Sequence, residues 1–103
     1  MRILILHGPN MNLFGIESAK AGEKLTLDKI NQYIRKYIRD KNTSIKIMQT
    51  HNETKAVSYL HKNRNKFDGL IMTPGSWSNN AYILNESLEI IDLDYVIINK
   101  TKY

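Results

Sequence analysis

The sequence predicts an α/β fold in which a parallel sheet of four strands carries helices on both faces. Short apolar runs alternate with amphipathic segments along the chain, and loops rich in Gly, Pro, Asn and Ser separate them. A length of 103 residues suits one domain, so we expect a single domain over residues 1–103. An apolar fraction of 42% with 24% charged residues indicates a globular chain and excludes a disordered one.

The first half of the chain predicts a strand, a loop and a helix. Residues 3–6 form a continuous apolar run that ends before Gly8, which is typical of a fully buried parallel strand. Residues 10–24 are polar and longer than a compact strand-to-helix connection needs, so we expect a long loop there. Apolar residues then recur at helical spacing over 26–42, where Thr26 can cap the first turn.

The middle of the chain predicts two strands on either side of a second helix. Residues 44–49 alternate between apolar and polar side chains, which indicates a strand near an edge of the sheet. The helix begins at Asn52 or Thr54 and runs to about residue 65, with Ala56, Val57 and Leu60 facing inward. Residues 67–72 are the third strand.

The last part of the chain repeats the pattern with a loop over 73–80, a helix over 81–91 and a strand over 95–98. Right-handed crossovers and burial of the first strand predict the flavodoxin-like strand order 2-1-3-4, a three-layer sandwich. Ligands bind such sheets at the switch point outside the carboxyl ends of the strands. We therefore expect a binding site where the loops over 8–24 and 73–80 meet.

Composition narrows the possible partners and compartments. Fifteen Lys and Arg against ten Asp and Glu give a net charge of +5, but these residues are scattered, so nucleic acid is not a favoured partner. The absence of Cys excludes disulfides and thiolate metal sites, and we expect no metal centre. No apolar run approaches the roughly 18 residues of a membrane span. We expect a cytoplasmic protein with no membrane partner.

The two loops at the switch point hold most of the candidate ligand-binding residues. They read H-G-P-N-M-N-L-F-G over 7–15 and T-P-G-S-W-S-N-N over 73–80. Amide, hydroxyl and backbone N–H groups in such loops can bind a polar or anionic ligand. The candidates are Asn10, Asn12, Lys20, Thr73, Gly75, Ser76, Trp77, Ser78, Asn79 and Asn80. The competing interpretation is that the same residues form only turns and helix caps.

Some of these side chains have two possible roles. Trp77 can stack on a ligand ring, although core packing is the favoured interpretation. Lys20 can close over an anionic ligand or simply keep its loop solvated. His7 follows the first strand and can act as an acid, but a histidine with satisfied hydrogen bonds at the sheet end is favoured. We expect His51 and His61 at the surface.

Three segments taken together resemble the type II dehydroquinases. They are G-P-N-M-N-L-F-G after the first strand, Q-T-H-N-E before the second helix and D-G-L-I-M-T-P-G-S-W-S-N-N after the third strand. The resemblance extends over residues 1–98. It implies the same fold, trimers assembled into a dodecamer, and dehydration of 3-dehydroquinate to 3-dehydroshikimate without a cofactor. We expect no cofactor, a small-molecule ligand, and a homo-oligomer based on trimers or reduced to a dimer.

The resemblance also implies a mechanism whose residues differ in this chain. In the family, a lid tyrosinate beside an arginine removes a proton alpha to a ketone. An Asn orients a water that stabilises the enolate, and a His protonates the leaving hydroxyl. Here Gly22 stands at the tyrosine, Glu17 at the arginine and Asn99 at the catalytic His. The other replacements are Thr73 for Asn, Asn79 for His, Ile97 for Glu and Thr101 for Ser. The family's fifth strand and last helix are missing.

Two polar positions of the family are kept, namely Asn12 and an acidic residue at Glu86, which is Asp in the family. Glu86, Asn99 and Thr101 therefore join the candidate ligand-binding residues. The pattern predicts a shortened, catalytically degenerate member without catalytic residues. It would bind, sequester or sense a small polar and anionic metabolite or nucleotide-like signal. The alternatives are an active 3-dehydroquinate dehydratase with rearranged residues and a structural subunit of an oligomer.

Overall fold

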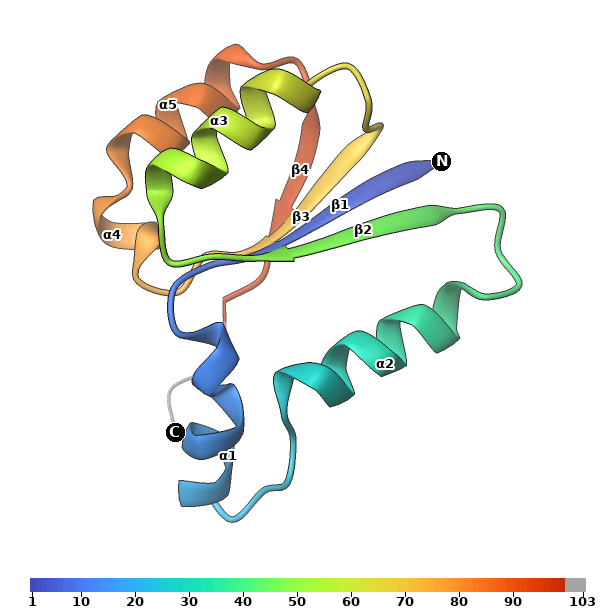
Figure 1. Cartoon of the computed structure of the whole chain (residues 1–103), viewed down its shortest axis with the longest axis vertical. Helices are drawn as coiled ribbons and strands as arrows, with labels where there is room; N and C mark the ends of the chain where they lie inside the picture. Colours follow the sequence, from blue (N-terminus) through green and yellow to red (C-terminus); the bar gives the residue numbers. More distant parts are fainter. Residues whose placement is uncertain (100–103) are drawn as a thin grey trace.

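Four parallel strands form one sheet in the computed structural model, which describes residues 1–99. The strands are β1 (Arg2–His7), β2 (Ser44–Gln49), β3 (Gly69–Thr73) and β4 (Asp94–Ile97). Their spatial order is β2-β1-β3-β4, so the predicted flavodoxin-like order is confirmed (Figure 1). The register places His7 opposite Gln49 on one side and Thr73 on the other. Polar residues thus meet at the carboxyl ends of three neighbouring strands.

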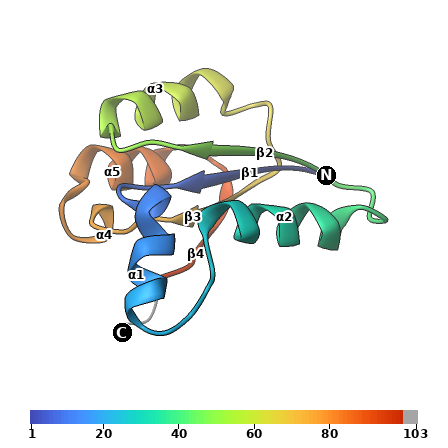
Figure 2. The ribbon, with the colours of Figure 1, turned by 60° about the horizontal axis from the view of Figure 1, so that its bottom comes forward.

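Helices lie on both sides of this sheet, as Figures 1 and 2 show. One face carries α3 (Glu53–Asn63), α4 (Trp77–Asn80) and α5 (Tyr82–Ile90). On the other side lies α2 (Leu27–Ile38), and the short η1 (Met11–Leu13) and α1 (Phe14–Lys20) extend beyond the carboxyl end of β1. The Thr26 hydroxyl caps α2 by accepting a hydrogen bond from the Lys29 N–H at 3.2 Å, as predicted.

The main hydrophobic core lies between the sheet and the α3–α5 layer. Its buried members include Leu4 and Leu6 of β1, with Leu60 of α3 and Leu84 of α5. Leu4 and Leu6 are two residues apart and so face the same side of the sheet, and Leu60 is among the residues predicted to face inward. The opposite face is less well covered, because α2 buries none of its residues. The inward apolar stripe of α2 is therefore only half-buried, and this difference between the two faces shapes the candidate site.

Three predicted element boundaries need correction. The segment predicted as a long loop over 10–24 contains η1 and α1, because Met11, Phe14 and Ser18 recur at helical spacing and are buried. The helix predicted to reach residue 42 ends at Ile38. The helix predicted over 81–91 is preceded by a separate turn of helix, α4, inside the segment predicted as a loop.

The outer edge of the sheet at β4 is exposed along its whole length. Tyr95, Val96, Ile97 and the following Ile98 are each at least 41% exposed. An apolar edge of this kind can pair with another chain. None of the helices within residues 1–99 is long and apolar enough to cross a membrane.

Candidate functional site

The two loops at the switch point are held together through their backbones. The Gly8 N–H donates a hydrogen bond to the Thr73 carbonyl oxygen at 2.8 Å. A Cβ atom on Gly8 would lie 2.5 Å from the Pro74 carbonyl oxygen, which leaves no room for a side chain. Gly75 has a φ of 57°, and a Cβ atom on it would lie 2.9 Å from the Pro9 carbonyl oxygen in the other loop. The glycines of both motifs therefore set a fixed frame at the carboxyl ends of β1 and β3.

A buried histidine lies at the centre of this frame. His7 is 1% exposed, and its Nε2 lies 3.0 Å from the Asn31 amide oxygen on α2. Because a carbonyl oxygen only accepts, Nε2 carries the proton and donates a hydrogen bond to Asn31. Nδ1 then accepts a hydrogen bond from the Thr73 hydroxyl at 2.8 Å. His7 thus connects β1, β3 and α2, and the favoured interpretation of a satisfied histidine at the sheet end is confirmed.

Burial lowers the pKa of His7 below its usual value of about 6.5, because the charged form is poorly solvated there. The hydrogen bond to Asn31 opposes this effect but is the weaker of the two influences. The imidazole is therefore neutral at pH 7. With a neutral ring whose two nitrogens are both engaged, His7 can orient neighbouring groups but has no free lone pair with which to remove a proton.

A cavity of about 230 Å³ lies against this histidine on the α2 side of the sheet. Apart from His7 and Thr73, it is lined mainly by apolar side chains, including Ile5, Ile30 and Ile71. A further hollow of about 400 Å³ continues beneath α2, past Ile3, Ile38 and Ile45. Both hollows follow from the shallow packing of α2 on the sheet.

The structure brings two of the predicted residues, Thr73 and Gly75, to this cavity. Asn12 lies instead in a separate hollow with Thr26 and Asp28. Asn10 and Lys20 share a third hollow in which Glu17 supplies a carboxylate. The expected polar site is thus divided among three hollows.

Asn10 has a structural role that the sequence does not reveal. Its backbone is left-handed, with a φ of 64°, and its N–H donates to Nδ1 of His51 at 3.0 Å. His51 is exposed, as predicted, and this contact connects the loop after β1 with the end of β2. His61 is also exposed, as predicted, and its Nε2 lies 2.9 Å from the Ser87 hydroxyl.

The remaining predicted residues lie outside the cavity. Trp77 is buried in the main core, as the packing interpretation predicts, and offers no open face to a ligand in this structure. The exposed residues are Ser76, Ser78, Asn79 and Asn80 at α4, Glu86 on α5 and Asn99 after β4. The Ser78 hydroxyl donates to the Gly75 carbonyl oxygen at 2.9 Å, so it completes a turn. Thr101 lies outside the described residues.

Asn31 is the site residue that sequence reasoning missed. It lies on the inward side of α2 among Leu27, Ile30 and Ile34, where a polar residue interrupts an apolar stripe. Such an interruption is a signal for a buried hydrogen-bond partner, although the sequence does not say which one. Within residues 1–99 the structure groups no three potential metal-ligating side chains.

Comparison with known proteins agrees with this geometry. A family model described as "Dehydroquinase class II" matches residues 1–100. A curated 3-dehydroquinate dehydratase of Pelotomaculum thermopropionicum is 27% identical over 99 residues, covering 96% of this chain and 69% of that protein. A second one, of Caldanaerobacter subterraneus, is 24% identical over 98 residues, and the match covers 95% of this chain and 66% of that protein. This chain thus spans about two-thirds of the length of the curated relatives it matches.

Solved structures show the same fold. A type II dehydroquinase from Butyrivibrio crossotus superposes with a TM-score of 0.85 at 22% identity, over 94% of this chain and 68% of that one. A 3-dehydroquinate dehydratase-like protein from Bifidobacterium longum gives a TM-score of 0.73 at 15% identity, over 100% of this chain and 74% of that one. The motif glycines, the strand order and the family match over residues 1–100 lead to one conclusion. The chain belongs to the class II dehydroquinase family.

Proposed function

We propose that this chain is a dehydroquinase-like protein that binds a small molecule without converting it. The observation that carries the proposal is the cavity at His7. Among the described residues that line it, His7 is the one titratable side chain, and both of its ring nitrogens are already hydrogen-bonded. A pocket without an available base or acid can hold a ligand but cannot transfer protons to or from it.

The lid supports the same proposal. The family resemblance implies a tyrosinate base next to an arginine, and this chain has Gly22 and Glu17 at those positions. Gly22 is exposed, and a Cβ atom placed on it would meet nothing within 4 Å. The first tyrosine of the chain is Tyr33, an exposed residue of α2. The proton-abstraction step therefore lacks its base on the lid.

The cavity lining favours a different ligand from the polar anion that the sequence suggests. Among residues 1–99 the lining contains no Lys or Arg, and Lys20 lies in another hollow beside Glu17. An apolar cavity of about 150 Å³ can hold a benzene ring, so 230 Å³ has room for a somewhat larger ring compound. We propose a ligand with an apolar body and one polar group that reaches His7 and Thr73.

Two matched variants test this assignment. Ile30 lines the cavity and Ile38 lines only the neighbouring hollow, while both are half-buried on α2. Native mass spectrometry of gently purified protein should first show whether a small molecule copurifies. In calorimetric titrations with phenol as probe, we expect Ile30→Trp to abolish binding by filling the cavity and Ile38→Trp to retain it. Equal loss in both variants would contradict the assignment to this cavity.

The relatives favour a second candidate, an active dehydratase with rearranged residues, because they carry that activity in their names. We expect no turnover of 3-dehydroquinate above background, since acid and base groups are each worth about 10² to 10⁴ in rate. Restoring single residues by Gly22→Tyr or Asn99→His should not recover it, because such groups act together. Turnover by the wild-type chain that Asn12→Ala abolishes would establish the enzyme and refute the non-catalytic proposal.

We also propose that the chain, taken as one domain over residues 1–103, assembles with itself. Support comes from the exposed apolar residues Tyr82, Ile83 and Ile90 of α5 and from the exposed residues of β4. A structural subunit that assembles but binds no ligand is the remaining alternative. It predicts oligomers without phenol binding, so the titrations above separate it from the binding proposal.

A further inference from the structure

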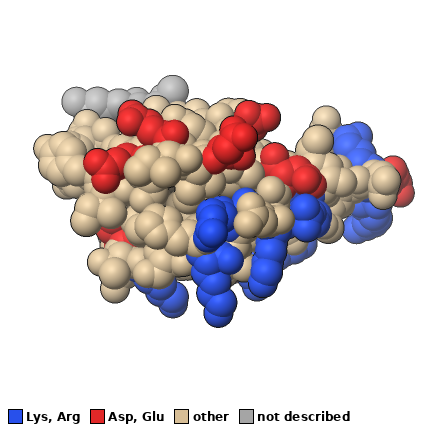
Figure 3. Space-filling model, turned by 90° about the horizontal axis from the view of Figure 1, so that it is seen from above, with Lys and Arg blue, Asp and Glu red and all other residues tan. Residues whose placement is uncertain are grey.

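Positively and negatively charged residues are concentrated in different stretches of this chain. Residues 27–66 contain ten Lys and Arg against three Asp and Glu, while residues 67–99 contain five Asp and Glu and no Lys or Arg. The strands β2 and β4 are opposite edges of the sheet, whereas the helices α3 and α5 of these two stretches are neighbours on one face of it. In the view of Figure 3, basic side chains gather along the lower side of the main body and most acidic side chains along its upper side, while both occur at the right-hand end.

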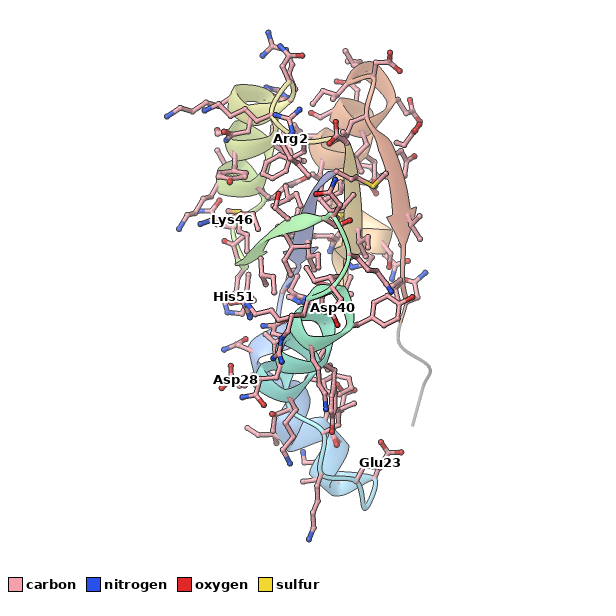
Figure 4. The ribbon with its side chains drawn as sticks, turned by 90° about the vertical axis from the view of Figure 1, so that its right-hand side faces the viewer. Arg2, Glu23, Asp28, Asp40, Lys46 and His51 are labelled. Carbon is pink, nitrogen blue, oxygen red and sulfur yellow. The ribbon has the colours of Figure 1, made fainter. Side chains whose placement is uncertain are left out.

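The clearest part of the positive side is formed by β2, α3 and the turn after α3. We call it the β2–α3 face and define it by Lys46, Lys55, Lys62, Arg64 and Lys66, which are all exposed. Figure 4 shows Lys46 on β2, on the side of the molecule where α3 lies. Lys55 and Lys62 are seven residues apart on α3, which places them on one helix face about 10 Å apart.

These five cations are not neutralised by the protein itself. Within residues 1–99, the one ion pair is between Arg2 and Asp68, at 3.5 Å. The single carboxylate of residues 44–66 is Glu53, and its Oε2 accepts a hydrogen bond from the Leu84 N–H at 3.1 Å. Glu53 is therefore turned toward α5. The face thus presents unpaired positive charge with neutral donors such as Asn65 among the cations.

The β2–α3 face lacks large exposed apolar side chains, and this lack narrows the class of partner. None of the large exposed apolar residues within residues 1–99 belongs to residues 44–66. Protein interfaces need a central apolar cluster, and membrane-bound helices need apolar residues to insert, so neither partner fits this face. Single-stranded nucleic acid binds by stacking bases on aromatic rings, and the one aromatic residue here, Tyr59, packs on Phe67 instead.

We propose that the β2–α3 face binds double-stranded nucleic acid through its phosphate backbone, independently of base sequence. A duplex carries one negative charge per about 1.7 Å of its axis, so cations about 10 Å apart meet several phosphates. Polar donors among the cations complete such backbone contacts. The sequence argued against nucleic acid because the cations are scattered along the chain, but the structure leaves the five within residues 46–66 exposed on β2, α3 and the turn after α3. This inference is independent of the cavity at His7.

Fluorescence anisotropy of a labelled duplex of 25 base pairs with the full chain tests the proposal. Each neutralised phosphate contributes about 0.9 to the slope of log K against log salt, so five cations predict a slope of about −4.5. The double variant Lys62→Gln/Lys66→Gln should reduce that slope by about 1.8 and weaken binding in 50 mM salt at least about tenfold. A duplex of unrelated sequence should bind equally well.

The matched control is Lys24→Gln/Lys29→Gln, which removes the same charge from exposed positions outside the face. We expect it to leave the slope within about 0.5 of the wild-type value. The proposal is overturned if the control weakens binding as much as Lys62→Gln/Lys66→Gln, or if the wild-type chain shows no salt-dependent binding. It is also overturned if a single strand, poly-glutamate or phosphatidylserine vesicles bind as tightly as the duplex at equal charge concentration.

Discussion

At the scale of single residues, His7 links the fold to pH. Its pKa is lowered in the folded protein, mainly by burial, so the unfolded chain binds a proton more readily. The stability that this neutral histidine contributes is present above the unfolded value of about 6.5 and is lost as pH falls through the folded pKa. We expect the free energy of unfolding in urea to decrease between pH 7.5 and pH 5. His7→Gln should show a smaller decrease, and equal decreases in both proteins would contradict this role.

Gly8 makes a second prediction at this scale. A methyl group there would collide with the Pro74 carbonyl oxygen, a backbone atom that cannot move alone. We expect Gly8→Ala to lower the free energy of unfolding by about 2 to 3 kcal/mol, as overpacked sites do. Gly69→Ala is the matched control, because its Cβ would lie 3.1 Å from the Ile3 Cδ1, the end of a flexible side chain that can shift. Its effect should stay below about 1 kcal/mol in thermal or urea unfolding.

At the scale of elements, α2 should be the least stable helix of the sandwich. None of its residues is buried, whereas α3 buries Ala56, Val57 and Leu60. Helices with few buried apolar contacts open locally at lower free energy. In hydrogen exchange followed by mass spectrometry, we expect the amides of α2 to exchange faster than those of α3.

The hydrogen bond between His7 and Asn31 provides the matched comparison. Asn31→Ala removes this contact and should speed exchange in α2 while leaving α3 unchanged. Gln32→Ala, at the exposed neighbouring position, should change neither helix. Equal protection of α2 and α3 in the wild-type chain would contradict the unequal covering of the two sheet faces.

At the scale of the whole molecule, the exposed apolar surface predicts self-association. Ile83 and Ile90 of α5 are 61% and 75% exposed. We expect an oligomer in light scattering at micromolar concentration, and we expect Ile83→Glu/Ile90→Glu to shift it toward the monomer by placing charge in an apolar contact. Ile16→Glu, at a residue of α1 that is 58% exposed, should leave the oligomer intact. A monodisperse wild-type monomer would contradict the assembly.

Local pattern determined most of the fold from the sequence alone. The apolar run at the start of the chain, the alternation in β2 and the cap at Thr26 each depend on neighbouring residues, so their elements could be predicted. Strand order followed from the handedness of the crossovers and the burial of β1. The switch-point loops and the family resemblance also came from contiguous motifs. Only η1, α1 and α4 were missed, because polar residues obscured the short helical spacing in their segments.

Tertiary structure decided which side chains meet. Asn31 contacts His7 although the two residues are 24 positions apart in the sequence. No local pattern specifies such a contact. The motifs predicted that Asn10, Asn12 and Thr73 line one site. They lie in three different hollows because the direction of each side chain depends on the packing of η1 and α1. The sequence determined where chain segments go, and three-dimensional packing determined what their side chains form, because such contacts depend on residues distant along the chain.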